Sequence, residues 1–160
     1  NWAIWSDFSE IPNREKPFLR YAETRIGKAV KLESREIIPL PANHTVPAVG
    51  YRMDSGEGSL VFSGDTTVCD DLWKAVNKIR NLRYLIIETA FSNRERQLAI
   101  ASKHLCPDML RGELLKLQRE AEIYITHLKP GQIELTMQEI EEFIGEYKPR
   151  MLQNNQVFEL

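Results

Sequence analysis

From Ser59 onward, short apolar runs alternate with amphipathic segments, and this alternation restricts the fold more than any other feature of the sequence. The apolar runs have the length and residue types of strands; they are "SLVFSGD" (59–65), "RYLIIET" (83–89) and "EIYIT" (122–126). The segments that separate and follow these runs predict helices over 69–81, 94–103, 107–120 and 136–147. Strands that alternate with helices in this order predict an α/β layered fold.

The first part of the chain predicts further strands. Residues 28–40 predict one or two strands with a polar turn near Ser34, and residues 48–54 predict another. The sequence "SGEG" (55–58) predicts a hairpin turn into the run that begins at Ser59. The last five residues, "QVFEL" (156–160), predict a short final strand.

Length, charge and cysteine content exclude several classes of protein. The 160 residues correspond to about one domain, and the 42% hydrophobic and 28% charged residues are typical of globular proteins. The net charge of -2 gives no positive surface for nucleic acid, and no apolar run approaches the roughly 20 residues that span a bilayer. Cys69 and Cys106 are far apart in the sequence, which predicts reduced thiols and a cytoplasmic location.

The polar residues at the ends of the predicted strands are candidates for a metal site. Asp65 comes directly after a strand, His127 follows the strand 122–126, and His44 precedes the strand 48–54. Because side chains at the carboxyl ends of neighbouring strands meet at one edge of a sheet, we expect these three to converge. Imidazole and carboxylate groups suit Zn²⁺, Mn²⁺ and Fe, and one carboxylate can bridge two metals.

Each of these residues also fits an ordinary structural role. Asp65 alone fits a helix cap or a turn residue, and His44 and His127 alone fit loop or core histidines. His104, the third histidine, fits a favourable position at the end of a helix, shortly before Pro107 begins the next one. The separations along the sequence form no local ligand motif, so the residue types by themselves leave both interpretations open.

Five motifs, in this order along the chain, resemble the second half of metallo-β-lactamase-fold phosphodiesterases. The motifs are "NHTVPAVGYRM" (43–53), "LVFSGDTT" (60–67), "LIIETAFSN" (85–93), "ASKHLCPDML" (101–110) and "YITHLKPG" (124–131). The sequence is most similar to the class II cyclic-nucleotide phosphodiesterases, with ribonuclease Z as a more distant relative, and residues 1–8 also resemble a segment of that group. The resemblance implies half or more of a four-layered αββα sandwich with a mixed sheet and flanking helices.

The resemblance also implies roles for individual residues. His44 matches a metal-ligating histidine, Asp65 matches the carboxylate that bridges two metals, and His127 matches the last histidine ligand. His104 matches a histidine that is not a metal ligand and that contacts the scissile phosphate or protonates the leaving oxygen. Four other residues lie in the same motifs without an individual role beyond contacts to ligands or phosphate: Thr66, Ser92, Asn93 and Lys129. The implied cofactors are two divalent metal ions, with Zn expected and Mn or Fe as alternatives.

The sequence departs from the family in one respect. The main metal motif, His-x-His-x-Asp-His, is absent, and no histidine precedes His44. The three remaining ligands are too few for two metals, since a catalytic zinc usually has three protein ligands plus water. This deficit, together with a first residue that is not Met, predicts that residues 1–160 are a single partial domain from the carboxyl-terminal portion of a longer enzyme.

The function that the resemblance implies is metal-dependent hydrolysis of 3′,5′-cyclic nucleotides (cAMP or cGMP), with activity that requires the missing motif. Ribonuclease Z-like processing of tRNA is one alternative, although the net charge disfavours nucleic acid as a partner. A non-catalytic chain with the same fold is the other alternative, because the absent motif agrees with it. We expect no association with membranes, and the sequence leaves open whether the protein is a homodimer.

Overall fold

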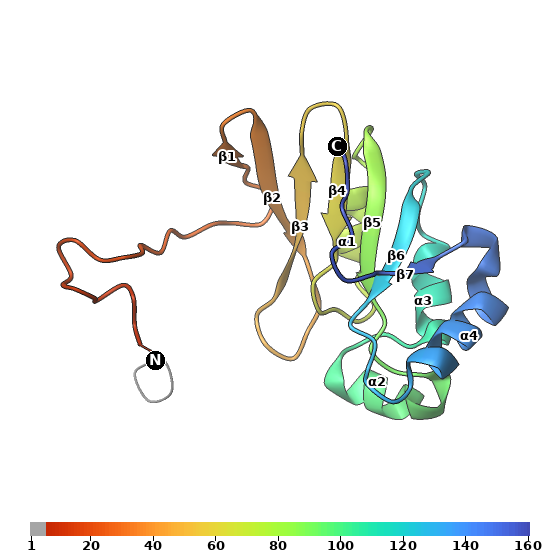
Figure 1. The fold of residues 1–160 in the computed structure, drawn as a ribbon. Helices are drawn as coiled ribbons and strands as arrows, with labels where there is room; N and C mark the ends of the chain where they lie inside the picture. Colours follow the sequence, from red (N-terminus) through yellow and green to blue (C-terminus); the bar gives the residue numbers. More distant parts are fainter. Residues whose placement is uncertain (1–5) are drawn as a thin grey trace.

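The computed structural model describes residues 6–160, which form a seven-stranded sheet with helices packed against it (Figure 1). The strands are β1 (Val30–Leu32), β2 (Arg35–Pro41), β3 (Val49–Asp54), β4 (Ser59–Phe62), β5 (Leu82–Glu88), β6 (Glu122–Thr126) and β7 (Arg150–Met151). They lie in the sheet in the same order as in the chain. The pairs from β1 to β4 are antiparallel and those from β4 to β7 are parallel, so the predicted mixed sheet is confirmed. Of the segment 1–8, the first five residues lie outside the described range.

The helices and one face of the sheet form the main core. The helices are α1 (Asp70–Val76), α2 (Arg96–Ser102), α3 (Pro107–Leu114) and α4 (Ile133–Ile144), with short 3₁₀ turns η1 (Asn93–Glu95) and η2 (Gly145–Tyr147). Alternate strand residues point into this core, where they meet apolar residues of the helices: Val61, Leu85, Ile87, Ile123, Ile125, Leu72, Val76, Leu110, Leu114, Ile140 and Ile144. Each such side chain contributes about 1.5–3 kcal/mol by leaving water, so this core holds the strand ends in fixed positions. Among residues 6–160, no helix is long and apolar enough to cross a membrane.

The opposite face of the sheet has a second, smaller apolar cluster. Leu60, Ile86 and Tyr124 are buried there, and the segment after β7 crosses the strands to cover them (Figure 1). Phe158 packs against both Tyr84 and Tyr124, with ring centroids 4.9 Å apart in each pair. The predicted strand over 156–160 is therefore wrong, because these residues pack on the face of the sheet instead of adding to its edge.

Two of the predicted helices end earlier than their apolar periodicity indicates. The helix predicted over 69–81 ends at Val76, and the helix predicted over 107–120 ends at Leu114. Asn77 connects both ends, because its side chain donates to Lys116 O (2.9 Å) and accepts from Gln118 N (2.8 Å). These bonds satisfy backbone groups that another helical turn would otherwise use. Pro107 occupies the first turn of α3, as its position in the sequence predicts.

Candidate metal and phosphodiester site

The turn after β4 places Asp65 at the edge of the sheet. Gly64 has a positive φ of 64°, and a Cβ atom at this position would lie 2.6 Å from Val49 O. Only glycine fits such a close approach, so the chain leaves β4 at this point and Asp65 turns out of the strand. The strand predicted over 59–65 accordingly ends at Phe62.

His127 follows β6 in a conformation that is unusual for its residue type. Its φ of 64° lies in the left-handed region, which costs a residue with a Cβ about 1 kcal/mol or more. Backbone hydrogen bonds on both sides hold it there, from Thr89 N to Thr126 O (3.0 Å) and from Lys129 N to Ala90 O (3.2 Å). The Nδ1 atom of His127 lies 2.8 Å from Asp65 Oδ1, so the turns after β4 and β6 meet as the sequence predicts.

His44 and His104 complete the group. His44 lies in the loop between β2 and β3, and His104 lies between α2 and α3. The ring of His104 lies between the other two, with centroids 4.8 Å from His44 and 4.9 Å from His127. The structure thus brings together all four residues that the sequence predicts, from four separate segments. Their roles as metal ligands or as the catalytic histidine stay predictions.

Sequence reasoning missed Glu88, which lies at the centre of the same edge. Glu88 ends β5, and its carboxylate is 1% exposed. Oε1 lies 2.7 Å from His104 Nδ1 and accepts a hydrogen bond from Thr66 N, and Oε2 accepts from the backbone N–H groups of Ala90 and Leu105. Glu88 therefore holds the ring of His104 in place and also binds the backbone of the three loops that carry Thr66, Ala90 and Leu105. The only signal in the sequence was a carboxylate at the end of a buried strand, the same signal that singled out Asp65.

Burial shifts the pKa values of Glu88 and His104 in opposite directions. It raises the pKa of Glu88 to about 7, against the lowering effect of the backbone N–H groups of Leu105 and Thr66. Burial lowers the pKa of His104, and the neighbouring His44 lowers it further. Below about pH 7 the pair is expected to hold one proton between Oε1 and Nδ1. In that state Nε2 of His104 carries a hydrogen whichever of the two atoms holds the shared proton.

The donor atoms at this edge fit a metal ion. Glu88, His104 and His127 each offer one ligand atom, and these three atoms lie within 4.8 Å of one another. The carboxylate of Glu88 already accepts several hydrogen bonds, whereas the Asp65 side chain is 47% exposed beside His127. An exposed carboxylate next to an imidazole is the better donor set, because no internal hydrogen bond network has to be broken.

The four other motif residues have structural contacts. Thr66 joins the loops by donating its N–H to Glu88 and accepting from Asn43 N (3.0 Å). Ser92 Oγ donates to Gln132 (2.8 Å) and Asn93 N donates to Glu139 (2.7 Å), which attaches the turn after β5 to the N-cap and the middle of α4. The ammonium group of Lys129 lies 5.4 Å from the ring centre of Phe91, which itself contacts His104.

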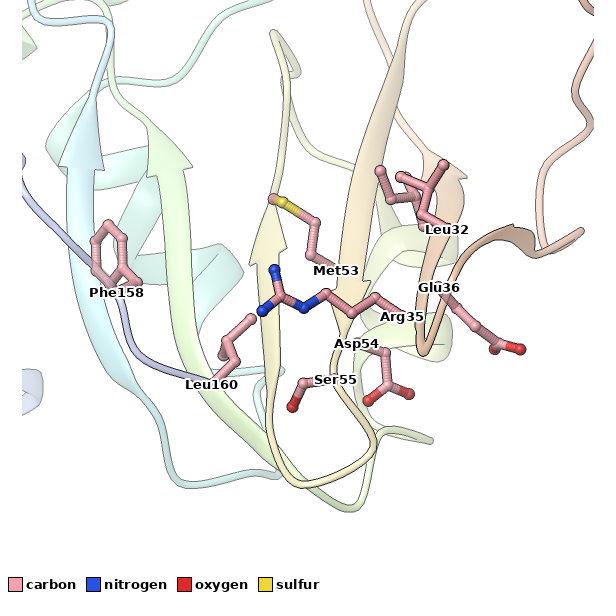
Figure 2. A pocket seen from close by; sticks show the side chains of 9 residues that line it. Leu32, Arg35, Glu36, Met53, Asp54, Ser55, Phe158 and Leu160 are labelled. Atoms are coloured by element: carbon pink, nitrogen blue, oxygen red, sulfur yellow. The ribbon is translucent and has the colours of Figure 1, made fainter.

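A separate hollow lies at the opposite edge of the sheet (Figure 2). It has a volume of about 260 Å³ and is lined by residues of β1, β2 and β3 and of the carboxyl-terminal segment, among them Leu32, Arg35, Met53, Phe158 and Leu160. Asp54, at its rim, ends β3 and therefore lies beside the start of β4, far along the sheet from Asp65. This hollow contains none of the predicted site residues.

Solved structures match the chain over most of its length. No protein-family model and no curated protein matches the sequence. The metallo-β-lactamase-fold protein YhfI from Bacillus subtilis matches with a TM-score of 0.67 and 17% identity over 85% of this chain. Yeast PDE1 matches with a TM-score of 0.65 and 16% identity over 81% of this chain. The chain has a metallo-β-lactamase fold. The predicted α/β layered architecture is thereby confirmed, with helices flanking a mixed sheet.

The match covers only part of each neighbour. This chain spans 54% of YhfI and 47% of yeast PDE1, about half of each structure. Human tRNase Z, short form, also matches, with a TM-score of 0.52, 20% identity, and coverage of 64% of this chain and 39% of the neighbour. At these identities the likeness shows a common fold and does not show a common activity.

Proposed function

We propose that this chain is part of a metal-dependent hydrolase that cleaves phosphodiesters, with 3′,5′-cyclic nucleotides (cAMP or cGMP) as its substrates. The observation that carries the proposal is the convergence of three histidines and Asp65 at the carboxyl edge of the sheet. His104 lies within 4.9 Å of the rings of His44 and His127, and Asp65 bonds to His127. The likeness to yeast PDE1 supports the same class of reaction.

His44, Asp65 and His127 are the proposed ligands of two divalent ions, with Zn expected and Mn or Fe as alternatives. Such ions supply Lewis acidity, which activates water and offsets the charge that develops on phosphoryl oxygens. Three protein ligands are too few for two ions. We therefore propose that residues outside this chain, with the His-x-His-x-Asp-His pattern, supply the others, in keeping with the half coverage of the neighbours.

His104 is the proposed catalytic residue. Its Nδ1 faces Glu88, so Nε2 points away from the buried carboxylate. While the pair holds its shared proton, Nε2–H is a hydrogen-bond donor, which suits a phosphoryl oxygen or the departing ribose oxygen. While Nε2 carries this hydrogen it cannot ligate a metal, so this protonation state suits a catalytic role instead of a ligand role.

Processing of tRNA is the second candidate function, because human tRNase Z also matches the chain. That reaction needs a positive surface along the RNA backbone, whereas this chain has a net charge of -2. A non-catalytic protein is the third candidate. We also propose a cytoplasmic location, which the buried free thiols of Cys69 and Cys106 support, and a homodimer is a further proposal.

The test compares substrates under one set of conditions. The complete protein, supplied with Zn²⁺ or Mn²⁺, is assayed with cAMP, cGMP and a precursor tRNA, and a chelated sample serves as the control. Metal-dependent release of nucleoside monophosphate supports the proposal. Cleavage of the precursor tRNA alone would assign the second function, and metal binding without hydrolysis of any of these substrates would assign the third.

A further inference from the structure

The loop that carries His44 has no regular secondary structure, so other contacts must fix the histidine. Lys103 makes three of them. Its backbone carbonyl oxygen lies 3.2 Å from His44 Nδ1, and its ammonium group donates to His44 O (3.3 Å) and to Asn43 Oδ1 (3.1 Å). A carbonyl oxygen only accepts, so Nδ1 of His44 must carry the hydrogen in this contact.

Lys103 occupies a backbone position that glycine usually takes. It ends α2 in the left-handed conformation, with φ 56° and ψ 51°. A residue with a Cβ loses about 1 kcal/mol or more there compared with glycine. The two hydrogen bonds of the ammonium group are a physical reason for a lysine at this position, because glycine would provide the turn but not the bonds.

Asn43 extends the connection to the turn that carries Asp65. Asn43 Nδ2 donates to Val68 O (2.9 Å), and Asn43 O accepts from Thr67 N (2.9 Å). Lys103 directly precedes His104. The pair of Lys103 and Asn43 therefore ties together the segments that carry His44, Asp65 and His104.

We infer that Lys103 is a positioning residue that selects the Nδ1–H tautomer of His44 and leaves the lone pair of Nε2 available to a metal ion. In this tautomer the hydroxyl group of Thr45, 3.5 Å from Nε2, is a competing donor at His44. A metal-ligating histidine whose other nitrogen donates to a backbone carbonyl is held in one ring orientation, and loss of such a contact typically lowers metal affinity 10- to 100-fold. The inference rests on the proposed function in so far as it assigns the lone pair to a metal.

The experiment uses the complete protein with substitutions at two lysines in the same backbone conformation. Lys103→Met keeps the aliphatic stem and removes the ammonium group, Lys103→Gly also removes the backbone strain, and Lys103→Arg keeps the positive charge. Lys148→Met is the matched control, because Lys148 also adopts the left-handed conformation at a helix end (φ 48°) but is exposed and far along the chain from His44.

Two measurements are made on each variant. Nitrogen chemical shifts of the histidine rings, recorded without metal at alkaline pH where imidazole is neutral, report the tautomer, and His44→Gln assigns the signal. Calorimetric titration with Zn²⁺ alone reports metal affinity. We expect the Met and Gly variants of Lys103 to lose the single Nδ1–H tautomer and about 10- to 100-fold in Zn²⁺ affinity. Lys103→Arg should lose less Zn²⁺ affinity, and Lys148→Met should match the wild type in both the tautomer of His44 and the Zn²⁺ affinity.

The two measurements separate this inference from the function on which it rests. An unchanged tautomer in Lys103→Met and Lys103→Gly would overturn the positioning role, whatever the affinity does. A changed tautomer with unchanged Zn²⁺ affinity would overturn the link to metal binding. Absence of Zn²⁺ binding in the wild type would instead remove the proposed function, and the tautomer would still decide whether Lys103 positions His44.

Discussion

Asp65, in the turn after β4, and Glu88, the last residue of β5, place their carboxylates at the same edge of the sheet, but the two side chains have different surroundings. Asp65 is 47% exposed and lies beside His127, whereas Glu88 is 1% exposed, accepts bonds from three backbone N–H groups and is hydrogen-bonded to the ring of His104. A carboxylate whose oxygens are already bonded orients its neighbours, and an exposed one is available to a ligand. Both carboxylates lie at the carboxyl end of a strand, so burial and internal hydrogen bonds separate the two roles.

The largest expected difference is in activity. Asp65→Ala should abolish metal-dependent hydrolysis by the complete protein, because it removes the proposed bridging carboxylate, and initial rates with a cyclic nucleotide measure the loss. The free energy of unfolding should change by about 0.5 kcal/mol or less, since the side chain is half-exposed. Full activity in the variant would remove Asp65 from the site.

His104 distinguishes a catalytic role from a ligand role. His104→Ala should lower turnover by about 10²- to 10⁴-fold, the usual contribution of a general acid, with metal content near that of the wild type. Elemental analysis after dialysis measures the bound metal. If the variant lost one metal ion per chain, His104 would be a ligand, together with Glu88 and His127.

Replacing Glu88 should mainly lower the stability of the folded protein. Glu88→Ala leaves the backbone N–H groups of Thr66, Ala90 and Leu105 unpaired inside the protein, and we expect a loss of about 3 kcal/mol in the free energy of unfolding. Urea denaturation measures this loss, and Asp65→Ala, which removes the exposed carboxylate at the same edge, is the matched control. Equal stability of these two variants would contradict the comparison of the two carboxylates.

The smallest effect is a change in the pH dependence of stability in the metal-free protein. Because the pKa of Glu88 is raised to about 7 in the folded protein, this group adds to the free energy of unfolding. Its contribution is complete below pH 4.5, the ordinary pKa of a glutamate, and is lost as the pH rises to about 7. The lowered pKa of His104 gives the opposite dependence. Its contribution to the free energy of unfolding is complete above pH 6.5, the ordinary pKa of histidine, and is lost as the pH falls below that value. The two dependences offset each other between pH 4.5 and 6.5.

Glu88→Gln removes only the first contribution. The variant should therefore lose stability as the pH is lowered through 6.5, while the wild type changes less over the same range. Urea midpoints at several pH values measure the difference, with chelator present so that the charged neighbours are those of the protein itself: Asp65, His44, His127 and Lys129. Parallel pH profiles for variant and wild type would show that the titration of Glu88 does not contribute to the pH dependence of stability.

Residues at strand ends were predictable from the sequence because the geometry of parallel strands is general. The apolar runs before Asp65 and His127 located the two turns, and the rule that carboxyl ends share an edge predicted that they meet. His44 lies in an irregular loop, and its place in the group came from the resemblance of its motif to a known family.

Other features depend on contacts between distant segments. Glu88 is a ring-orienting residue only because the segments of Thr66 and Leu105 bring their N–H groups to it, and neither lies near it in the sequence. The segment 156–160 has the residue types of a strand, but the free face of the sheet offers Phe158 two aromatic neighbours. In both cases tertiary packing decided between local structures that the sequence alone permits.

The agreement between strand order and chain order has a consequence for the speed of folding. Each strand pairs with the one made immediately before it, so no strand has to insert between two that have already joined. The connections from β1 to β4 are short, which lowers the entropy lost in closing those loops and favours fast pairing, whereas the parallel pairs from β4 to β7 are joined through helices and pair more slowly. The antiparallel part of the sheet is therefore suited to assembly one strand at a time as the ribosome releases the chain.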